Sequence, residues 1–324
     1  METGLFVGVD LGATQIRACL ARPDCTVVFR SSRLTLADRG PSEVVERIRQ
    51  TISEAMAPAD GPHAVLGIGV AAPGPLDPRT GVLLSPPNLP GWDRIPLRDI
   101  IQDAFGIPVF VNNDANLAAL GEFRLGAGRG TSDMVYLTIS TGLGAGIICG
   151  GQLLMGAHGF AGEPGHATIQ PNGERCSCGN VGCLEGLAAG PAIARQALRL
   201  IEQGPDSILP ALISPGSALT AEIVGEAALR GDAVALEAIS WAAHYLGIGV
   251  LNLIHILDPE IVVMGGGVTK LGSLLFEPVR DWIACHAMTE VQRRTPIVPA
   301  ELGEDVGLLG AVVYVKEELA HAGV

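Results

Sequence analysis

Lysine is nearly absent from this chain. Lys270 and Lys316 are the two lysines in 324 residues, and 21 Lys and Arg stand against 34 Asp and Glu, which gives a formal net charge of −13. A general nucleic-acid-binding protein is therefore not expected, because neutralising phosphates requires clustered Lys and Arg. A P-loop, GxxxxGK[ST], is also excluded, since neither lysine directly follows the last glycine of such a loop.

Targeting and membrane-spanning segments are also lacking. The start METGLFVGVD has no basic segment followed by a long apolar stretch, so no signal peptide is expected. The most apolar helical stretch, Tyr245–Leu257, is interrupted by Asn252 and His255 and is too short to span a bilayer. Seven unevenly spaced cysteines are too few for a disulfide scaffold and indicate a reducing compartment. We expect a soluble, cytoplasmic protein without a membrane partner.

Glycine, by contrast, is abundant. The chain has 43 Gly in 324 residues, about 13% against a usual ~7%, so many turns or close backbone approaches are expected. The 48% content of hydrophobic residues excludes a disordered chain. At this length we expect one large domain or two medium ones.

Alternating strands and helices predict an α/β fold with a mixed sheet. The first part of the chain has predicted strands at Leu5–Val9, Ile16–Ala21, Val27–Arg30, Val65–Ala71 and Ile107–Val111, and a helix over Ser42–Met56 with Ser42 as its cap. The second part has predicted strands at Met134–Ile139, Ala145–Cys149 and Ile261–Met264, and helices at Ala115–Phe123 and near 188–203, 219–229, 232–257 and 273–288. A last helix near 307–319 is expected to pack on the first domain.

Both parts open with a strand, a Gly/Thr turn and a second strand, VGVDLGATQIRACL and VYLTISTGLGAGII. The pair would suit a phosphate clamp, although two unrelated β-hairpins give the same pattern. The first turn, from Asp10 to Thr14, taken alone is better explained as a polar hairpin turn, although its Asp could hold Mg²⁺. The second, with Thr141 and Gly142, and a third bare turn, Gly265–Gly267, add weight to phosphate and adenosine binding.

Asp114 follows a predicted buried strand in the segment NNDAN. The carboxyl ends of strands are where α/β folds place ligand-binding groups. A carboxylate there can accept the proton of a substrate hydroxyl while that hydroxyl attacks phosphorus. Capping of the following helix explains the same residue equally well.

One His and three Cys have the spacing of a metal site. His166 precedes CSCGNVGC, which contains Cys176, Cys178 and Cys183 among glycines. These four residues match a tetrahedral Zn²⁺ site. A disulfide is the alternative, but C-x-C is too tight for an easy bridge.

The motifs DLGAT, NNDANLAALGE, TISTGLGAGII, GEPGH and CSCGNVGCLE, in this order and at these separations, resemble the ROK family of sugar kinases and related repressors over nearly the whole chain. The resemblance implies an α/β protein of two ribonuclease-H-like (actin-like ATPase) domains with mixed sheets flanking a central cleft. We expect a small domain from residues 1–112 plus 308–324 and a large one from 113–307, with the zinc-binding loop at 163–185.

The resemblance also implies roles. Asp114 would be the general base for a sugar's 6-hydroxyl, and sugar hydroxyls would bind Asn113, Asp114, Glu163, His166 and Glu185. Nucleotide would contact Asp10, Gly12, Ala13, Thr14, Thr141, Gly142, Gly265, Gly266 and Gly267. His166, Cys176, Cys178 and Cys183 would hold structural Zn²⁺, with the second ring nitrogen of His166 left for a sugar hydroxyl.

Two residues depart from the pattern DxGGTK of many relatives. Ala13 replaces the second Gly, so the turn must not need a positive φ there, and Gln15 replaces the Lys and removes a cation. Asp10 and Thr14 remain, so ATP with Mg²⁺ stays the expected donor.

The implied activity is ATP-dependent phosphorylation of a hexose at its 6-hydroxyl, with glucokinase first and N-acylmannosamine kinase, fructokinase or allokinase as alternatives. The loop near Pro73–Pro75 and Asn88 would decide among these sugars. A repressor would need a helix-turn-helix domain before the first phosphate motif, whereas nine residues precede Asp10 here. A sugar-binding regulator without catalysis is disfavoured because Asp114 and both phosphate turns are intact. The resemblance implies a homo-oligomer, a dimer or tetramer.

Overall fold

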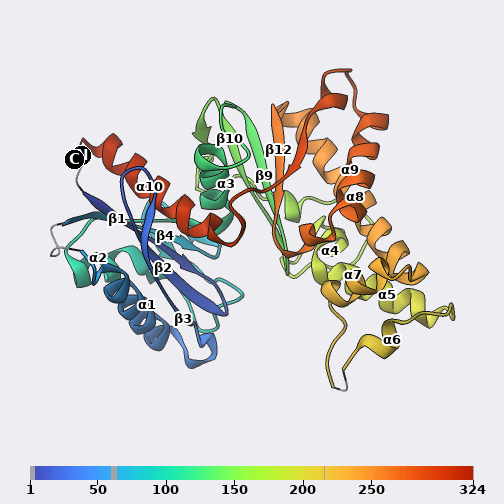
Figure 1. The fold of residues 1–324 in the computed structure, drawn as a ribbon, viewed down its shortest axis with the longest axis horizontal. Helices are drawn as coiled ribbons and strands as arrows, with labels where there is room; N and C mark the ends of the chain where they lie inside the picture. Colours follow the sequence, from blue (N-terminus) through green and yellow to red (C-terminus); the bar gives the residue numbers. More distant parts are fainter. Residues whose placement is uncertain (1–3, 60–63, 215, 324) are drawn as a thin grey trace. The chain divides into compact units, whose positions relative to one another are not determined.

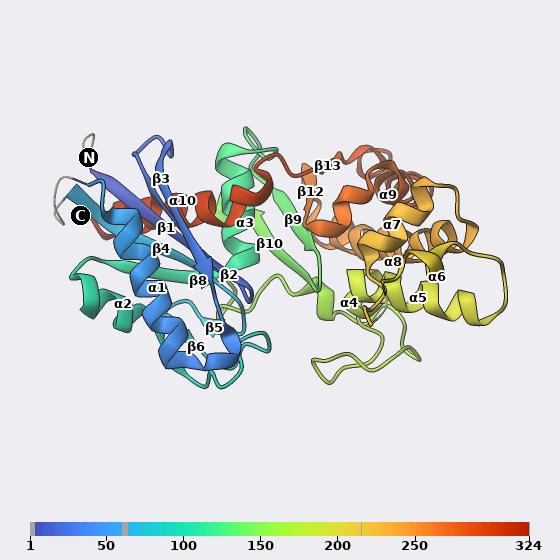
Figure 2. The same ribbon diagram turned by 60° about the horizontal axis from the view of Figure 1, so that its bottom comes forward.

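Two compact units make up the chain in the computed structural model (Figures 1 and 2). It describes residues 4–59, 64–214 and 216–323, so residues 1–3, 60–63 and 324 of the expected first domain lie outside the described part. The first unit takes the residues up to Arg129, Leu153–Ala161 and those from Glu301 on; the second takes Gly130–Gln152 and Gly162–Ala300.

The sheet of the first unit has the order β3-β2-β1-β4-β8. β1 (Leu5–Leu11), β2 (Gln15–Ala21) and β3 (Val27–Leu34) are antiparallel, while β4 (Val65–Ala72) and β8 (Val109–Asn113) run parallel to β1. β5 (Leu76–Asp77), β6 (Val82–Leu83) and β7 (Ile95–Pro96) form a small separate sheet. The predicted mixed α/β sheet is confirmed.

Helices cover the two faces of this sheet. Apolar residues of α1 (Pro41–Met56) and α2 (Leu97–Phe105) join a core with alternate residues of β1 and β2. α10 (Val306–Ala322) packs on β1 and β4 as expected, over glycines: a Cβ on Gly69 would lie 2.0 Å from the carbonyl oxygen of Ala311. Ser42 is not the cap of α1, because the helix begins at Pro41 with Gly40 in the cap position.

The contacts divide the chain elsewhere than at residues 112 and 307. α3 (Asp114–Leu125) belongs to the first unit because it packs along α10. The two helices come close at Gly310, where a Cβ would lie 1.8 Å from the carbonyl oxygen of Leu117. The boundary therefore follows helix packing rather than the end of β8.

The second unit repeats this topology. Its sheet has the order β11-β10-β9-β12-β13, in which β9 (Met134–Ile139) and β10 (Leu143–Cys149) form an antiparallel hairpin and β12 (Ile261–Gly265) and β13 (Ile297–Pro299) are parallel to β9. β11 (Gln152–Leu153) lies at the edge. The internal similarity in the sequence thus corresponds to two sheets of the same topology.

Helices α4 (Glu185–Ala188), α5 (Gly190–Glu202), α6 (Leu209–Leu212), α7 (Ala221–Leu229), α8 (Ala233–Leu257) and α9 (Ser273–His286) complete the second unit. α8 alone among the described helices is long and apolar enough to cross a membrane. It packs against α5, α7 and α9, and 61% of its most apolar window is buried. Glu237, Ser240 and His244 are exposed on its outer side, so α8 has a buried apolar face and a polar face, as a helix packed on one side against protein does.

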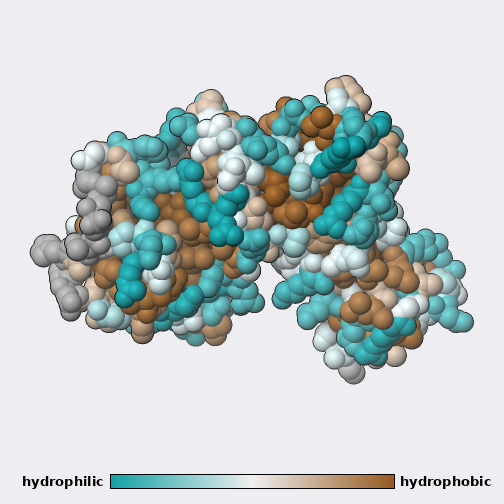
Figure 3. All heavy atoms as spheres, turned by 45° about the horizontal axis from the view of Figure 1, so that its top comes forward, coloured by the Kyte–Doolittle hydropathy of each residue, from teal (hydrophilic) through white to brown (hydrophobic). Residues whose placement is uncertain are grey.

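Figure 3 shows hydrophilic residues over much of the visible surface, with hydrophobic patches between them. The most exposed large apolar side chains among the described residues are Leu229, Val291, Ile256 and Met288, which are 81%, 78%, 77% and 76% exposed. All four belong to the second unit.

Candidate functional site

The first phosphate turn joins β1 to β2, and its residues Ala13, Thr14 and Gln15 are exposed. Gly12 lies close to the returning chain, since a Cβ there would lie 3.0 Å from the carbonyl oxygen of Gln15. Ala13 is not among the described residues with positive φ, so an alanine fits without strain. The buried Thr35, which sequence reasoning missed, donates its hydroxyl to the Gly12 carbonyl at 2.6 Å and its amide to the Thr14 carbonyl at 2.8 Å.

Asp10, at the end of β1, does not stand alone. Its Oδ2 accepts a hydrogen bond from Nη2 of Arg17 at 2.5 Å. The first turn of α10 lies against the same carboxylate, because a Cβ on Gly307 would lie 3.0 Å from Oδ2 of Asp10. Two positive groups therefore surround Asp10: a guanidinium and a helix N-terminus.

From the sequence, Asp114 is either a proton acceptor or the cap of the following helix, and the structure places Asn113 in the cap position. Asn113 is the N-cap of α3, and its Oδ1 accepts from the backbone N–H groups of Ala115 and Asn116 at 2.9 and 3.3 Å. Asp114 is the first residue of the helix, and its carboxylate is exposed with Oδ1 2.8 Å from the Ala115 amide. Asn113 therefore holds the N-cap position, and Asp114 presents its carboxylate at the carboxyl end of β8 while Oδ1 accepts from the Ala115 amide.

Asn112 holds this segment in place. It is fully buried, and its Oδ1 accepts from the Asn113 amide at 2.7 Å and from Nδ2 of Asn116 at 3.2 Å. Its Nδ2 lies 3.6 Å from the sulfur of Met155. These contacts tie the end of β8 to the first turn of α3, so Asn112 and Asn116 fix the backbone that carries Asp114. The sequence showed an Asn-rich segment but gave no sign of which Asn is buried.

The second phosphate turn, in the second unit, is packed against Glu185. Thr141 is exposed, and the carbonyl of Gly142 accepts from the Ser140 amide at 2.9 Å. Oε2 of Glu185 accepts from the Leu143 amide at 3.0 Å and would lie 2.7 Å from a Cβ on Gly142. The predicted phosphate residue Gly142 and the predicted sugar residue Glu185 are therefore neighbours, and a Cβ at 142 would push the carboxylate of Glu185 aside.

Gly142→Ala should displace the Glu185 carboxylate and weaken sugar binding about tenfold or more, as expected when a charged hydrogen-bonding group is lost. Calorimetric titration with glucose measures this, with Gly186→Ala as the matched control, because a Cβ on Gly186 meets nothing within 4 Å. Equal glucose affinity in the two variants would contradict the role given to Glu185.

Glu163 and His166 lie on a short turn before the cysteine loop. Pro164–His166 forms one turn of 3-10 helix, and the His166 amide donates to the Glu163 carbonyl at 3.2 Å. Burial raises the pKa of Glu163, and the Glu185 carboxylate adds to this while the neighbouring His166 acts in the opposite direction. The three predicted sugar residues of this unit thus act on one another electrostatically.

The four predicted metal ligands are brought together. One ligand atom from each of His166, Cys176, Cys178 and Cys183 lies within 4.8 Å of all the others. Nδ1 of His166 is 3.8 Å from the Cys176 sulfur, and the Cys178 and Cys183 sulfurs are also 3.8 Å apart. A tetrahedral ion with metal–sulfur bonds of about 2.3 Å requires sulfurs about 3.8 Å apart. The donor set therefore fits a tetrahedral metal ion, and no disulfide joins these residues.

The thiols in this cluster differ in acidity. Burial raises the pKa of Cys183 to about 12, whereas a backbone hydrogen bond from Asn180 lowers the pKa of Cys178. A buried thiol of this kind loses its proton when it binds a cation. The Cys176 sulfur also lies 3.9 Å from Oε1 of Glu185, so this cluster adjoins one of the predicted sugar residues.

A cavity of about 730 Å³ adjoins the second phosphate turn within the second unit. The predicted residues Thr141 and Gly267 line it. Gly266 has a φ of 90°, and a Cβ there would lie 2.4 Å from the carbonyl oxygen of Ile139, at the end of β9. Sequence reasoning missed most of its wall, because helix residues that line a cavity look like core residues: Ser140, Gly190, Pro191, Ala194, Leu219, Thr220, Ala221, Glu222, Gly225, Glu226, Leu229, Val268, Lys270, Leu271 and Leu274. Its size and mixed lining suit a nucleoside.

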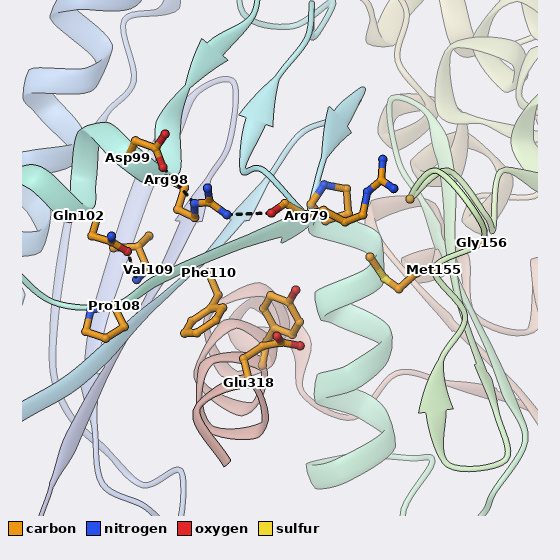
Figure 4. A pocket seen from close by; sticks show the side chains of 13 residues that line it. Arg79, Arg98, Asp99, Gln102, Pro108, Val109, Phe110, Met155, Gly156 and Glu318 are labelled. Atoms are coloured by element: carbon orange, nitrogen blue, oxygen red, sulfur yellow. Dashed lines mark hydrogen bonds and ion pairs between the residues drawn. The ribbon is translucent and has the colours of Figure 1, made fainter. Parts of the chain in front are cut away.

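A second cavity, of about 460 Å³, lies within the first unit (Figure 4). Phe110, Met155 and Glu318 line it, and Figure 4 shows Arg98 hydrogen-bonded to the main chain of Arg79 at its edge. Burial raises the pKa of Glu318. None of the predicted site residues lines this cavity, so it is separate from the site described above.

Comparison with known proteins gives matches over nearly the whole chain. The family model described as "ROK family" matches residues 6–318. The glucokinase of Thermotoga maritima is 36% identical over 314 residues, 97% of this chain and 98% of that protein. A xylose repressor of Caldicellulosiruptor bescii is 33% identical over 98% of this chain and 79% of its own length.

A solved structure, of a ROK family glucokinase from Streptomyces griseus in complex with glucose and AMPPNP, is 34% identical with a TM-score of 0.83, and the match covers 97% of this chain and 100% of that one. The predicted α/β fold of the actin-like ATPase type is confirmed by this likeness.

Proposed function

The chain belongs to the ROK family, and on that premise we propose that it is an ATP-dependent hexose kinase that phosphorylates glucose at its 6-hydroxyl. The observation that carries the proposal is the position of Asp114: an exposed carboxylate at the carboxyl end of β8, on the first residue of α3. The likeness to glucokinases, one of them with glucose and AMPPNP bound, supports the choice of substrates.

In the proposed reaction Asp114 accepts the proton of the 6-hydroxyl as that oxygen attacks the γ-phosphorus of ATP. The bond from this phosphorus to the β–γ bridging oxygen breaks, and ADP leaves with the electron pair. Transfer of phosphate needs little covalent chemistry from the protein, so the two turns contribute by position and by hydrogen bonds. Asp10, Gly12, Ala13 and Thr14 belong to one, and Thr141 and Gly142 to the other.

The adenosine moiety is assigned to the cavity of about 730 Å³ beside Thr141 and Gly267. Gly265, Gly266 and Gly267 form the turn without side chains that we assign to the adenosine moiety. Mg²⁺ would be held by the nucleotide phosphates and by Oδ1 of Asp10, since Oδ2 is bonded to Arg17. When bound, this ion neutralises phosphate charge.

Glucose is assigned to Asn113, Asp114, Glu163, His166 and Glu185. A zinc ion in the His166–Cys183 cluster would fix the loop at 163–185 and keep Nδ1 of His166 engaged, which leaves Nε2 as the donor or acceptor for a sugar hydroxyl. The ion is structural in this proposal and takes no part in phosphate transfer.

We place the enzyme in the cytoplasm, at the entry of glucose into glycolysis, and assign it a homo-oligomeric state, as a dimer or tetramer. The exposed Val291, Ile256 and Met288 of the second unit support an association surface, because large apolar side chains at a surface mark interaction sites. No nucleic-acid partner is proposed, in keeping with the charge of −13.

A sugar-responsive regulator without catalysis is the second candidate, favoured by the match to a xylose repressor. Coupled assays of ADP release with glucose, mannose, fructose, N-acetylmannosamine and xylose decide between the two. We expect the highest kcat/KM with glucose. Sugar binding without ADP release from any of the five would instead favour the regulator, and a preference for fructose or N-acetylmannosamine would change the assigned substrate.

A further inference from the structure

Arg17 is the charged residue of the first phosphate turn that has no role so far. It lies on β2 directly opposite Asp10 in the antiparallel register of β1 and β2. The side chains of Gln15 and Arg17 share one face of β2, because Ile16 between them is buried in the core while both neighbours reach solvent. Arg17 is thus the next residue on the same face of β2 after Gln15, the position where many relatives have a lysine.

The guanidinium is only partly used. Nη2 of Arg17 hydrogen-bonds Oδ2 of Asp10 at 2.5 Å, and the side chains are 28% and 16% exposed. Within the part of the chain that the structure describes, no other hydrogen bond of this guanidinium is found. An arginine has five N–H donors in a planar fork, so most of them remain for a ligand.

Neither lysine of the chain replaces it. Lys316 donates to the Pro23 carbonyl at 2.7 Å, and Lys270 lies in the wall of the second unit's cavity. The neighbouring Arg30 on β3 pairs with Asp305 at 2.7 Å. Without Arg17, a phosphate approaching the turn would meet the carboxylate of Asp10 with no side-chain cation beside it, and only Mg²⁺ and the α10 N-terminus would offset the repulsion.

We propose that Arg17 supplies the cation of the first phosphate turn: one N–H group holds Asp10, and the remaining donors bind the terminal phosphate of the nucleotide. The inference rests on the proposed function, in that it assumes a nucleoside triphosphate at this turn. An arginine suits the task because its fork can engage a carboxylate and a phosphate oxygen together. It also explains how the chain tolerates Gln15.

Arg17→Ala tests this in the full chain, with the dissociation constant of Mg²⁺–AMPPNP and that of glucose measured separately by calorimetry. We expect AMPPNP binding to weaken about 10- to 100-fold, as for lost charge-assisted hydrogen bonds, and glucose binding to stay within about twofold. The double variant Arg17→Ala/Gln15→Lys should recover most of the AMPPNP affinity. Arg30→Ala, which removes an exposed arginine from the adjacent strand, should leave both constants unchanged.

Unchanged AMPPNP affinity in Arg17→Ala would overturn the inference, as would the absence of AMPPNP binding by the wild-type chain. Equal losses of AMPPNP and glucose affinity with a lowered Tm would also overturn it, because they would indicate a merely structural role. The proposed function is decided separately by sugar turnover. A wild-type protein that binds AMPPNP but phosphorylates no sugar would refute that function while the titrations still decide the role of Arg17.

Discussion

Replacing Asp114 by Asn should lower kcat for glucose phosphorylation about 10²- to 10⁴-fold, the usual contribution of a general base. The amide keeps the size and the hydrogen-bonding reach of the carboxylate but cannot accept the proton of the 6-hydroxyl. Asn113 caps α3, and the amide oxygen of an asparagine at 114 can still accept from the Ala115 N–H, so the helix start is retained. We therefore expect the Kd for glucose and the Tm to change little.

Steady-state kinetics and glucose titration of the same preparation separate these effects. Asp103→Asn is the control, because Asp103 is an exposed aspartate on α2 outside the assigned site. Undiminished kcat in Asp114→Asn would remove Asp114 as the base. A large loss of glucose affinity with little change in kcat would make it a binding residue instead.

Removal of the metal should weaken glucose binding about 10- to 100-fold, although the ion is assigned no contact with phosphate. The segment Ala167–Leu184, which follows the turn at Pro164–His166, contains no helix or strand, only isolated bridges. An ion bound by the four predicted ligands would cross-link this segment. Loss of the ion would free the Nδ1 of His166 and loosen the contact of Cys176 with Glu185. His166 and Glu185 are both assigned to sugar hydroxyls, so glucose binding should weaken.

Cys178→Ser is the variant of choice because Cys178 is the exposed ligand of the cluster, and Cys285→Ser removes an exposed cysteine outside it. Elemental analysis should find about one zinc per chain in the wild type and in Cys285→Ser, and less in Cys178→Ser. The weakened glucose binding should follow the metal content. A metal-free protein with unchanged glucose Kd would contradict the assigned role of the cluster.

The sequence predicted the fold well where strands alternate with turns. The strands from Leu5 to Val111 and the hairpin at residues 134–149 stand where apolar runs and glycine turns placed them. Ser42 failed as a cap because Pro41 already fits the first turn of a helix, which moves the cap to Gly40. The unit boundary was missed because the packing of α3 on α10 joins segments that are almost 200 residues apart.

The site residues, like the fold, were predictable where local spacing defines them and not where contacts between distant segments do. The clustering of His166 with the three cysteines was predictable because their spacing is typical of a metal site. Thr35 and Arg17 were not, since their roles arise from pairing across β-strands. The wall of the large cavity, including Thr220 and Lys270, comes from helices whose apolar faces show no difference between core and ligand contact.

The glycine surplus also has two origins. Fourteen of the 43 Gly lie between Gly142 and Gly190, the stretch assigned to phosphate, sugar and metal. Gly69 and Gly310 serve packing instead, since a Cβ at either would overlap a backbone carbonyl of the neighbouring element. Composition alone could not separate these two uses.

Product identity tests the central claim most directly. ³¹P NMR of the reaction with ATP should show glucose 6-phosphate forming in step with ADP when glucose is supplied, and no sugar phosphate when 6-deoxyglucose replaces it. ADP with inorganic phosphate but no sugar phosphate, or sugar binding without any ADP, would contradict the account of this chain as a hexose kinase.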